Sequence, residues 1–127
     1  MVRARFVRAV AALGAVFWLV VGFWAFFAPR SFVEEVGTFP PYNEHFVHDA
    51  GAFALGLGVV LVLALLEFPS LSVALTGSAL AAGLHEVAHF LDEDLGGKDA
   101  DRITLGLLAV LLVAAAAASW PQRRGRL

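Results

Sequence analysis

The chain has 127 residues, of which 60% are hydrophobic and 16% are charged, and its mean hydropathy is +0.79. This length suits a single domain, and so high a hydropathy excludes an ordinary water-soluble globular protein, so we expect lipid as the solvent. The absence of cysteine excludes disulfides and thiolate metal sites. Histidine and carboxylate side chains remain as the groups that could carry chemistry.

Four apolar runs follow one another along the chain, at about 7–28, 46–66, 71–91 and 103–119. Each is long enough to cross a hydrocarbon core about 30 Å thick, which needs roughly 20 helical residues. They predict an all-α fold, a four-transmembrane-helix antiparallel bundle that forms one integral membrane domain over 1–127. Four spans place both termini on the same side.

The first run contains Gly14 and Gly22, which let a neighbouring helix approach closely. Pro29 is expected to end this helix, because proline removes a backbone donor. The segment 30–42 is predicted as a loop that folds over the end of the bundle. Asn43 is a suitable N-cap for the second helix.

The distribution of charge orients the predicted bundle. Six of the nine basic residues flank the terminal ends: Arg3, Arg5, Arg8, Arg123, Arg124 and Arg126. Of the eleven acids, Glu67 alone falls on that side. The positive-inside rule therefore predicts cytoplasmic termini and a multi-pass protein of the plasma (inner) membrane. Basic tails of this kind suit anionic lipid, so we expect the lipid bilayer as partner and no nucleic acid.

Polar residues interrupt the second and third runs near their outer ends. Ionisable groups inside a membrane cost roughly 2.5–3.5 kcal/mol each on insertion scales and by default indicate a functional site. The short turn at 67–70 makes these two helices antiparallel neighbours, which would set His48 opposite His89. The expected polar layer consists of His45, His48, Asp49, His85, Glu86 and His89.

Several interpretations of this layer remain open. His85 and His89, four residues apart, suit a divalent transition metal such as Zn, Cu or Fe, and residues of the second helix could complete the ligand set of His45, His48, Asp49, His85 and His89. A haem held by two histidines is a variant. Alternatively, the histidines hydrogen-bond one another and fix helix register, or they relay protons.

The segment His85-Glu86-Val87-Ala88-His89 also matches the H-E-x-x-H pattern of zinc metallopeptidases, in which the glutamate is the general base. Glu86 would then be catalytic. A five-residue pattern with two free positions arises readily by chance, and a chain this small leaves little room for a substrate cleft. Peptidase activity is therefore the weakest of these interpretations.

The chain also shows a family resemblance, carried by four short spans, a proline-containing first outer loop, the segment Tyr42-Asn43-Glu44-His45-Phe46-Val47-x-Asp49 and two histidines four apart late in the third span. It resembles small four-helix bacterial membrane proteins, especially actinobacterial ones, broadly similar to the DoxX-like superfamily. The resemblance implies that His45, Asp49, His85 and His89 are the positions to watch. Glu86 departs from the residue expected between the paired histidines, which weakens the peptidase interpretation further.

Together these features predict an integral membrane protein with an outward-facing His/carboxylate pocket that binds metal or haem in a redox-accessory role. The alternative is a non-catalytic accessory or assembly subunit of a larger membrane complex. A membrane-protein partner and a homo-oligomer both remain open.

Overall fold

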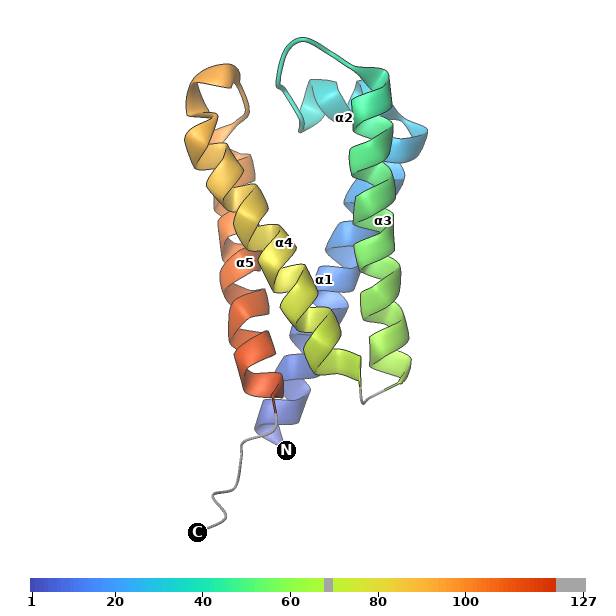
Figure 1. Ribbon diagram of the computed structural model, residues 1–127, viewed down its shortest axis with the longest axis vertical. Coiled ribbons are helices and arrows are strands. Elements are labelled where there is room, and N and C mark those ends of the chain that lie inside the picture. The colour runs from blue at the N-terminus through green and yellow to red at the C-terminus, as the bar shows by residue number, and fades with distance from the viewer. Residues whose placement is uncertain (68–69, 121–127) are drawn as a thin grey trace.

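The computed structural model describes residues 1–67 and 70–120, which are helical throughout most of their length. The elements are α1 (Val2–Phe27), α2 (Pro29–Glu35), α3 (Glu44–Leu66), α4 (Leu71–Leu91), the short 3₁₀ turn η2 (Glu93–Leu95) and α5 (Asp99–Ser119) (Figure 1). The four long helices are each long and apolar enough to cross a membrane. The predicted all-α bundle of four membrane-spanning helices is therefore confirmed.

Three of the long helices begin two to five residues earlier than predicted, because polar first turns continue the helix beyond the apolar run. The start of α1, the end of α3, the start of α4 and the end of α5 lie at one end of the bundle (Figure 1). The side of the membrane that this end faces stays a prediction. Arg123, Arg124 and Arg126, on which that prediction partly rests, lie outside the described residues.

The segment 30–42 was predicted as a loop, but most of its first half belongs to the helix α2. Pro29 ends α1 and also occupies the first turn of α2, where its missing N–H leaves no helical bond unmade. The side chain of Trp24 holds α2 against α1, because its Nε1 donates to Ser31 Oγ at 3.2 Å and its ring meets Phe32 edge to face.

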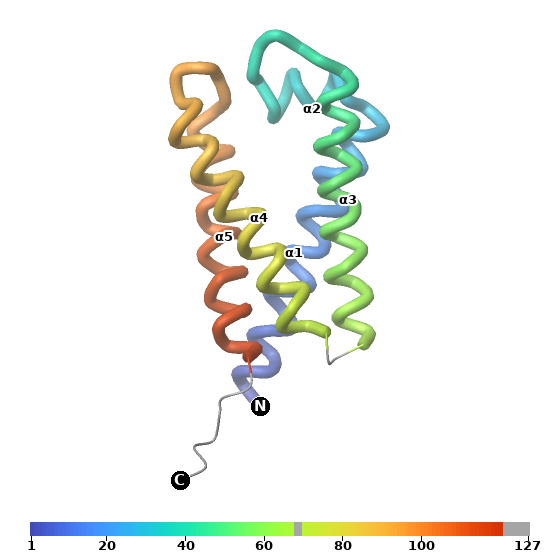
Figure 2. The backbone as a smooth tube through the Cα atoms, in the orientation of Figure 1, coloured from blue at the N-terminus to red at the C-terminus, as the bar shows by residue number. Residues whose placement is uncertain are grey.

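The bundle consists of two helix pairs, α1 with α3 and α4 with α5 (Figures 1 and 2). Glycines draw the first pair together: a Cβ on Gly22 would lie 2.6 Å from the backbone nitrogen of Leu55, and a Cβ on Gly51 would lie 2.7 Å from that of Phe26. The two pairs meet near the end of α3 and the start of α4, and they diverge toward the opposite end (Figures 1 and 2). The expectation that α3 and α4 lie side by side as far as His48 and His89 is therefore wrong.

The hydrophobic core fills the half of the bundle in which α3 ends and α4 begins, which we call the turn half. Leu61, Leu75 and Leu112 are fully buried in it, and Trp18 Nε1 donates to Ser78 Oγ at 2.9 Å across the two helix pairs. Toward the other end, the core stops at Trp18, Ala54, Ala82 and Leu108. The remainder, with α2 and the loops that cover it, is the mouth half.

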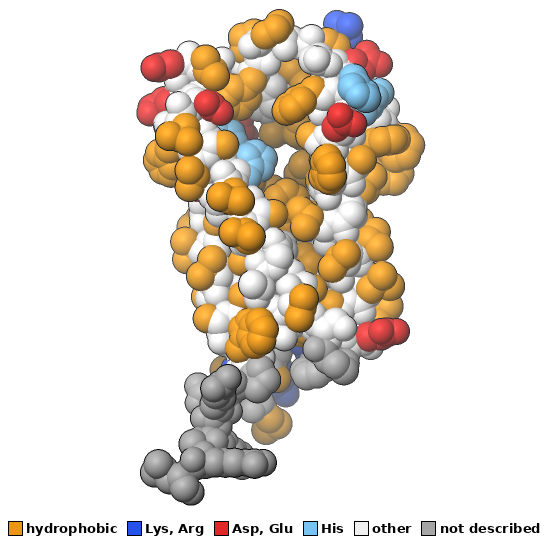
Figure 3. All heavy atoms as spheres, viewed as in Figure 1, with side chains coloured by type: hydrophobic (Ala, Val, Ile, Leu, Met, Phe, Trp, Pro, Cys, Tyr) orange, Lys and Arg blue, Asp and Glu red, His pale blue; other side chains and the backbone are white. Residues whose placement is uncertain are grey.

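Apolar side chains cover the body of the bundle, whereas acidic and histidine side chains gather at the mouth end (Figure 3). Large outward-facing residues such as Leu80 and Leu107 are each 63% and Val110 is 68% exposed. Such a surface would be unstable in water but suits hydrocarbon, where the backbone bonds of a helix are all satisfied internally. The arrangement of the surface thus supports a bilayer around the body of the bundle.

Candidate functional site at the mouth of the bundle

A cavity of about 600 Å³ lies in the mouth half, where the two helix pairs have separated. We call it the mouth cavity. It is bordered by the first turns of α3, the last turns of α4 and the segment that contains α2 and residues 36–43. Figure 3 shows the surface hollowed at this level, with histidine side chains at the edge of the hollow. Its volume is in the range of pockets that hold small organic molecules, roughly 300–1,000 Å³.

The walls of the mouth cavity are mainly aromatic and apolar. Phe32, Phe39, Tyr42 and Phe46 contribute rings from four different places in the segment 32–46. These residues were not among the predicted site residues, because the predicted site consisted of polar groups. The available signal was the concentration of aromatic residues and prolines in a connection predicted to cover the bundle.

His85 and His89 supply the imidazoles of the mouth cavity. Four residues apart on α4, they share one helix face, and their rings are stacked with centroids 5.0 Å apart and planes at 19°. His89 is only 8% exposed, and the ring of Phe39 packs edge-on against it at 5.6 Å. Two of the predicted ligands are thus brought together and face one space.

The polar residues of α3 lie elsewhere. His45 and Asp49 form an exposed pair at 3.6 Å between Nε2 and Oδ2, and the ring of His48 packs on Phe26 of α1 at 5.4 Å. None of these three residues lines the mouth cavity. Because α3 packs along α1, the expected approach of His48 to His89 gives way to a contact within the first helix pair.

The geometry consequently divides the predicted ligand set. Within 1–67 and 70–120, no three His, Asp or Glu side chains are grouped so that they could hold a metal ion. Binding of a metal ion or of haem stays a prediction. Of the five predicted ligands, only His85 and His89 lie together.

Glu86, the predicted catalytic base, points from α4 toward α5 and does not line the mouth cavity. A Cβ on Gly106 would lie 3.3 Å from Glu86 Oε1, so this glycine makes room for the carboxylate between the two helices. Among the described residues, Glu86 Oε2 is buried and has no hydrogen-bond partner. This position leaves the carboxylate away from the space that the two imidazoles share.

Two loops meet over the mouth cavity and form what we call the clasp, residues 35–39 and 95–98. Lys98 Nζ donates to the carbonyl oxygen of Glu35 at 2.6 Å, and the Gly97 amide donates to that of Thr38 at 3.3 Å. Gly97 has a φ of +88°, and a Cβ there would lie 2.8 Å from the ring of Phe39. The connection from α4 to α5 thus packs on the earlier loop through its two glycines, Gly96 and Gly97.

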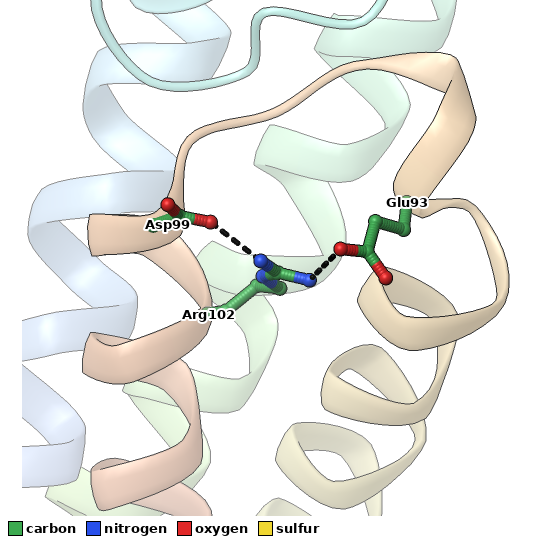
Figure 4. A network of polar contacts seen from close by, with 3 residues as sticks. All are labelled: Glu93, Asp99 and Arg102. Atoms are coloured by element: carbon green, nitrogen blue, oxygen red, sulfur yellow. Dashed lines mark hydrogen bonds and ion pairs between the residues drawn. The ribbon is translucent and has the colours of Figure 1, made fainter.

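Arg102 fixes the α5 side of the same loop. Its guanidinium lies between two carboxylates, with Nη1 at 3.1 Å from Glu93 Oε1 and Nη2 at 2.5 Å from Asp99 Oδ1 (Figure 4). His89 lies at the border between the mouth cavity and a smaller polar cavity of about 180 Å³ that these groups surround. Glu93 and Asp99 therefore share one guanidinium, and neither carboxylate joins the two imidazoles.

The beginning of α3 forms the opposite rim. Asn43 Oδ1 accepts from the backbone N–H of Phe46 at 3.1 Å, which confirms the predicted N-cap. The hydroxyl of Tyr42 donates to Glu44 Oε2 at 3.2 Å, and the guanidinium of Arg30 lies 5.0 Å from its ring centroid. Loss of hydration and then the Glu44 carboxylate raise the pKa of Tyr42. The rim thus presents a neutral phenol at physiological pH.

A scan against protein-family models, a search of curated proteins and a search of solved structures each returned no match for this chain. The resemblance to the DoxX-like superfamily stays a prediction. The mouth cavity and its pair of imidazoles are the features on which a function can be based.

Proposed function

We propose that the protein is a membrane-embedded binding protein in a redox-accessory role, which holds haem in the mouth cavity through His85 or His89. The observation that carries this proposal is the stacked pair of imidazoles facing a space of about 600 Å³ with mainly aromatic walls. Pockets for cofactors are typically apolar, with a few polar groups that fix orientation.

The number of available ligands favours haem over a bare ion. A structural zinc site takes four protein ligands and a catalytic site takes three, whereas only two imidazoles meet here. Haem iron brings its own equatorial nitrogens and needs only axial ligation from the protein. Because His85 and His89 stack on one helix, they cannot ligate opposite faces of one porphyrin. One of the two imidazoles, and not both, would therefore hold the haem iron.

The position of Glu86 does not support a hydrolytic role. A general base must reach the water that it activates, directly or through one further water. The Glu86 carboxylate lies against Gly106 of α5 instead of beside the two imidazoles. We leave peptidase activity out of the proposal for this reason.

The first experiment is titration of haem into protein purified without a histidine tag, followed by its visible absorption spectrum. The wild type is compared with the His85→Ala/His89→Ala variant, and with His45→Ala/His48→Ala as the matched control outside the mouth cavity. We expect a shifted, saturable haem band in the wild type and in the control, and its loss in the first variant. Equal spectra in all three proteins would contradict the proposal.

Elemental analysis of the same preparations separates the alternatives. Zinc, copper or iron in near-stoichiometric amount without a porphyrin band would indicate that the ligand is a metal ion and not haem. A second chain would then have to supply further ligands. No metal and no haem binding in a stably folded protein would favour the accessory-subunit alternative. An open groove of about 630 Å³ on the outer face of α4 and α5, which includes Gly83, Ala117 and Trp120, is the observation that supports that alternative.

We also propose that the termini face the cytoplasm and the clasp faces the outside of the plasma membrane. Arg3, Arg5 and Arg8 at the beginning of α1 support this orientation. Because the chain has no cysteine, one cysteine at a time can be introduced at position 4 or position 98. An impermeant maleimide should label only position 98 in intact cells, and the opposite pattern would reverse the topology.

A further inference from the structure

We infer that the ligand of the mouth cavity enters and leaves sideways from the membrane, through the opening between α3 and α4, while the clasp keeps the end of the bundle closed. The inference rests on the proposed function in that it gives the route of the same ligand. It also restricts the ligand to molecules that dissolve in the bilayer. Such a ligand has a large apolar body and one group that an imidazole can bind.

The end of the bundle is closed by specific contacts. The clasp joins the connection from α1 to α3 with the connection from α4 to α5, through the bonds from Lys98 to Glu35 and from Gly97 to Thr38. Gly96 and Gly97 come so close to the other loop that a Cβ on either would lie within 3 Å of one of its atoms. A solute from the water would have to break these contacts.

The side of the bundle is open at the same level. The mouth cavity is bordered there by Phe46 and Ala50 on α3 and by His85 and Ala88 on α4. Both alanines are small, and the two helices belong to different packed pairs, so neither helix covers the gap. Figure 3 shows the hollow between them below the covering loops.

The opening lies within the membrane-spanning helices. Ala50 is in the second turn of α3 and Ala88 is in the last turn of α4, and both helices qualify as spans. Phe46 and Phe90, at 71% and 63% exposed, present apolar surface near this level. A molecule dissolved in the bilayer would therefore meet the opening directly, whereas a hydrophilic solute would be excluded by hydrocarbon on this side and by the clasp at the end.

The experiment measures haem uptake from preloaded vesicles of phosphatidylcholine and phosphatidylglycerol. The variant Glu35→Cys/Lys98→Cys, treated with a short bis-maleimide, holds the clasp closed. Ala50→Trp narrows the side opening, and Ala52→Trp, on the same helix but away from the mouth cavity, is its matched control. We expect an unchanged rate for the cross-linked protein and for the control, and a rate about tenfold lower for Ala50→Trp, within the range that mutations of one binding site produce.

Slower uptake after cross-linking, or an unchanged rate for Ala50→Trp, would overturn the side route. A matching arm adds haem to the water instead of the vesicles. Faster uptake from water than from vesicles would equally contradict the inference, because it would place the entrance on the aqueous side.

A second measurement needs no ligand and so separates the route from the proposed function. A nitroxide label at Ala88→Cys should collide with oxygen, which concentrates in lipid, more often than with a water-soluble nickel chelate. Labels at Leu80→Cys and Lys98→Cys provide the lipid and water references. A label at position 88 that behaves like the one at position 98 would overturn the side route even if haem binding holds. A lipid-like signal without haem uptake would refute the proposed function alone.

Discussion

The two halves of this bundle are built on different principles, although the same four helices run through both. In the turn half, leucine and alanine side chains from all four helices form one continuous core. In the mouth half, the helix pairs separate around the mouth cavity, and loop contacts of the clasp connect them instead. Both halves have the same helical backbone, so the difference lies in which side chains face inward.

This difference indicates where stability is concentrated, and the proposed ligand site lies in the other half. Interior packing holds the two helix pairs together in the turn half, whereas in the mouth half a few hydrogen bonds of the clasp connect them. Regions with few buried apolar contacts open at lower free energy than the core, and ligand sites are usually drawn from them. The division suits a protein whose ligand must come and go while the bundle stays folded.

The largest effect is expected from a core leucine of the turn half. Leu112 is fully buried, and Leu112→Ala should lower the free energy of unfolding by about 2 kcal/mol, the lower end of the range for buried leucines, because lipid already solvates the unfolded side chain. Leu107→Ala, on the lipid-facing side of the same helix, is the control and should change it little. The free energy of unfolding of both variants is measured in bicelles. Equal losses would show that burial in the turn half stabilises the bundle no more than contact with lipid does.

A second substitution tests whether the mouth half is loose within each helix pair or only between the pairs. Gly51→Ala would bring a Cβ to 2.7 Å from the Phe26 nitrogen, so α1 and α3 must move apart. Overpacking of this kind typically costs about 1–3 kcal/mol. Gly56→Ala, with nothing within 4 Å, should be neutral or slightly stabilising. A small loss of stability for both variants would mean that α1 and α3 are themselves loosely packed.

The helices could be predicted from the sequence because their apolar runs have the length of a membrane span. Their partners could not be predicted so well. The short connection between Leu66 and Leu71 makes α3 and α4 antiparallel, but it determines their distance only near the turn. Farther along, Gly22 and Gly51 decide that α3 follows α1. Gly22 was recognised as a point of close approach, whereas its counterpart on α3 was not.

The candidate site was predicted in part for the same reason. His85 and His89 share a face because helical periodicity alone places them there. His48 was assigned to their site on the assumption that α3 faces α4, and it packs on Phe26 instead. The cavity walls and the clasp depend on contacts between two loops far apart in the sequence. Helical periodicity carries no information on such contacts, although Gly96 and Gly97 were a sign that a close approach was needed.

The smallest effect concerns two Trp–Ser hydrogen bonds, one in each half. Trp18 donates to buried Ser78 at 2.9 Å, whereas Trp24 donates to exposed Ser31 at 3.2 Å. Ser78→Ala leaves a buried indole N–H unpaired and should cost on the order of 0.6–1.7 kcal/mol, the range for hydrogen bonds between membrane helices. Ser31→Ala should change the free energy of unfolding by less than about 0.5 kcal/mol, as expected for an exposed position.

Because Trp18 and Ser78 belong to different helix pairs at the level where the core ends, their bond helps to set where the pairs separate. A larger loss for Ser31→Ala than for Ser78→Ala would mean that the attachment of α2, rather than this cross-pair contact, limits the stability of the bundle.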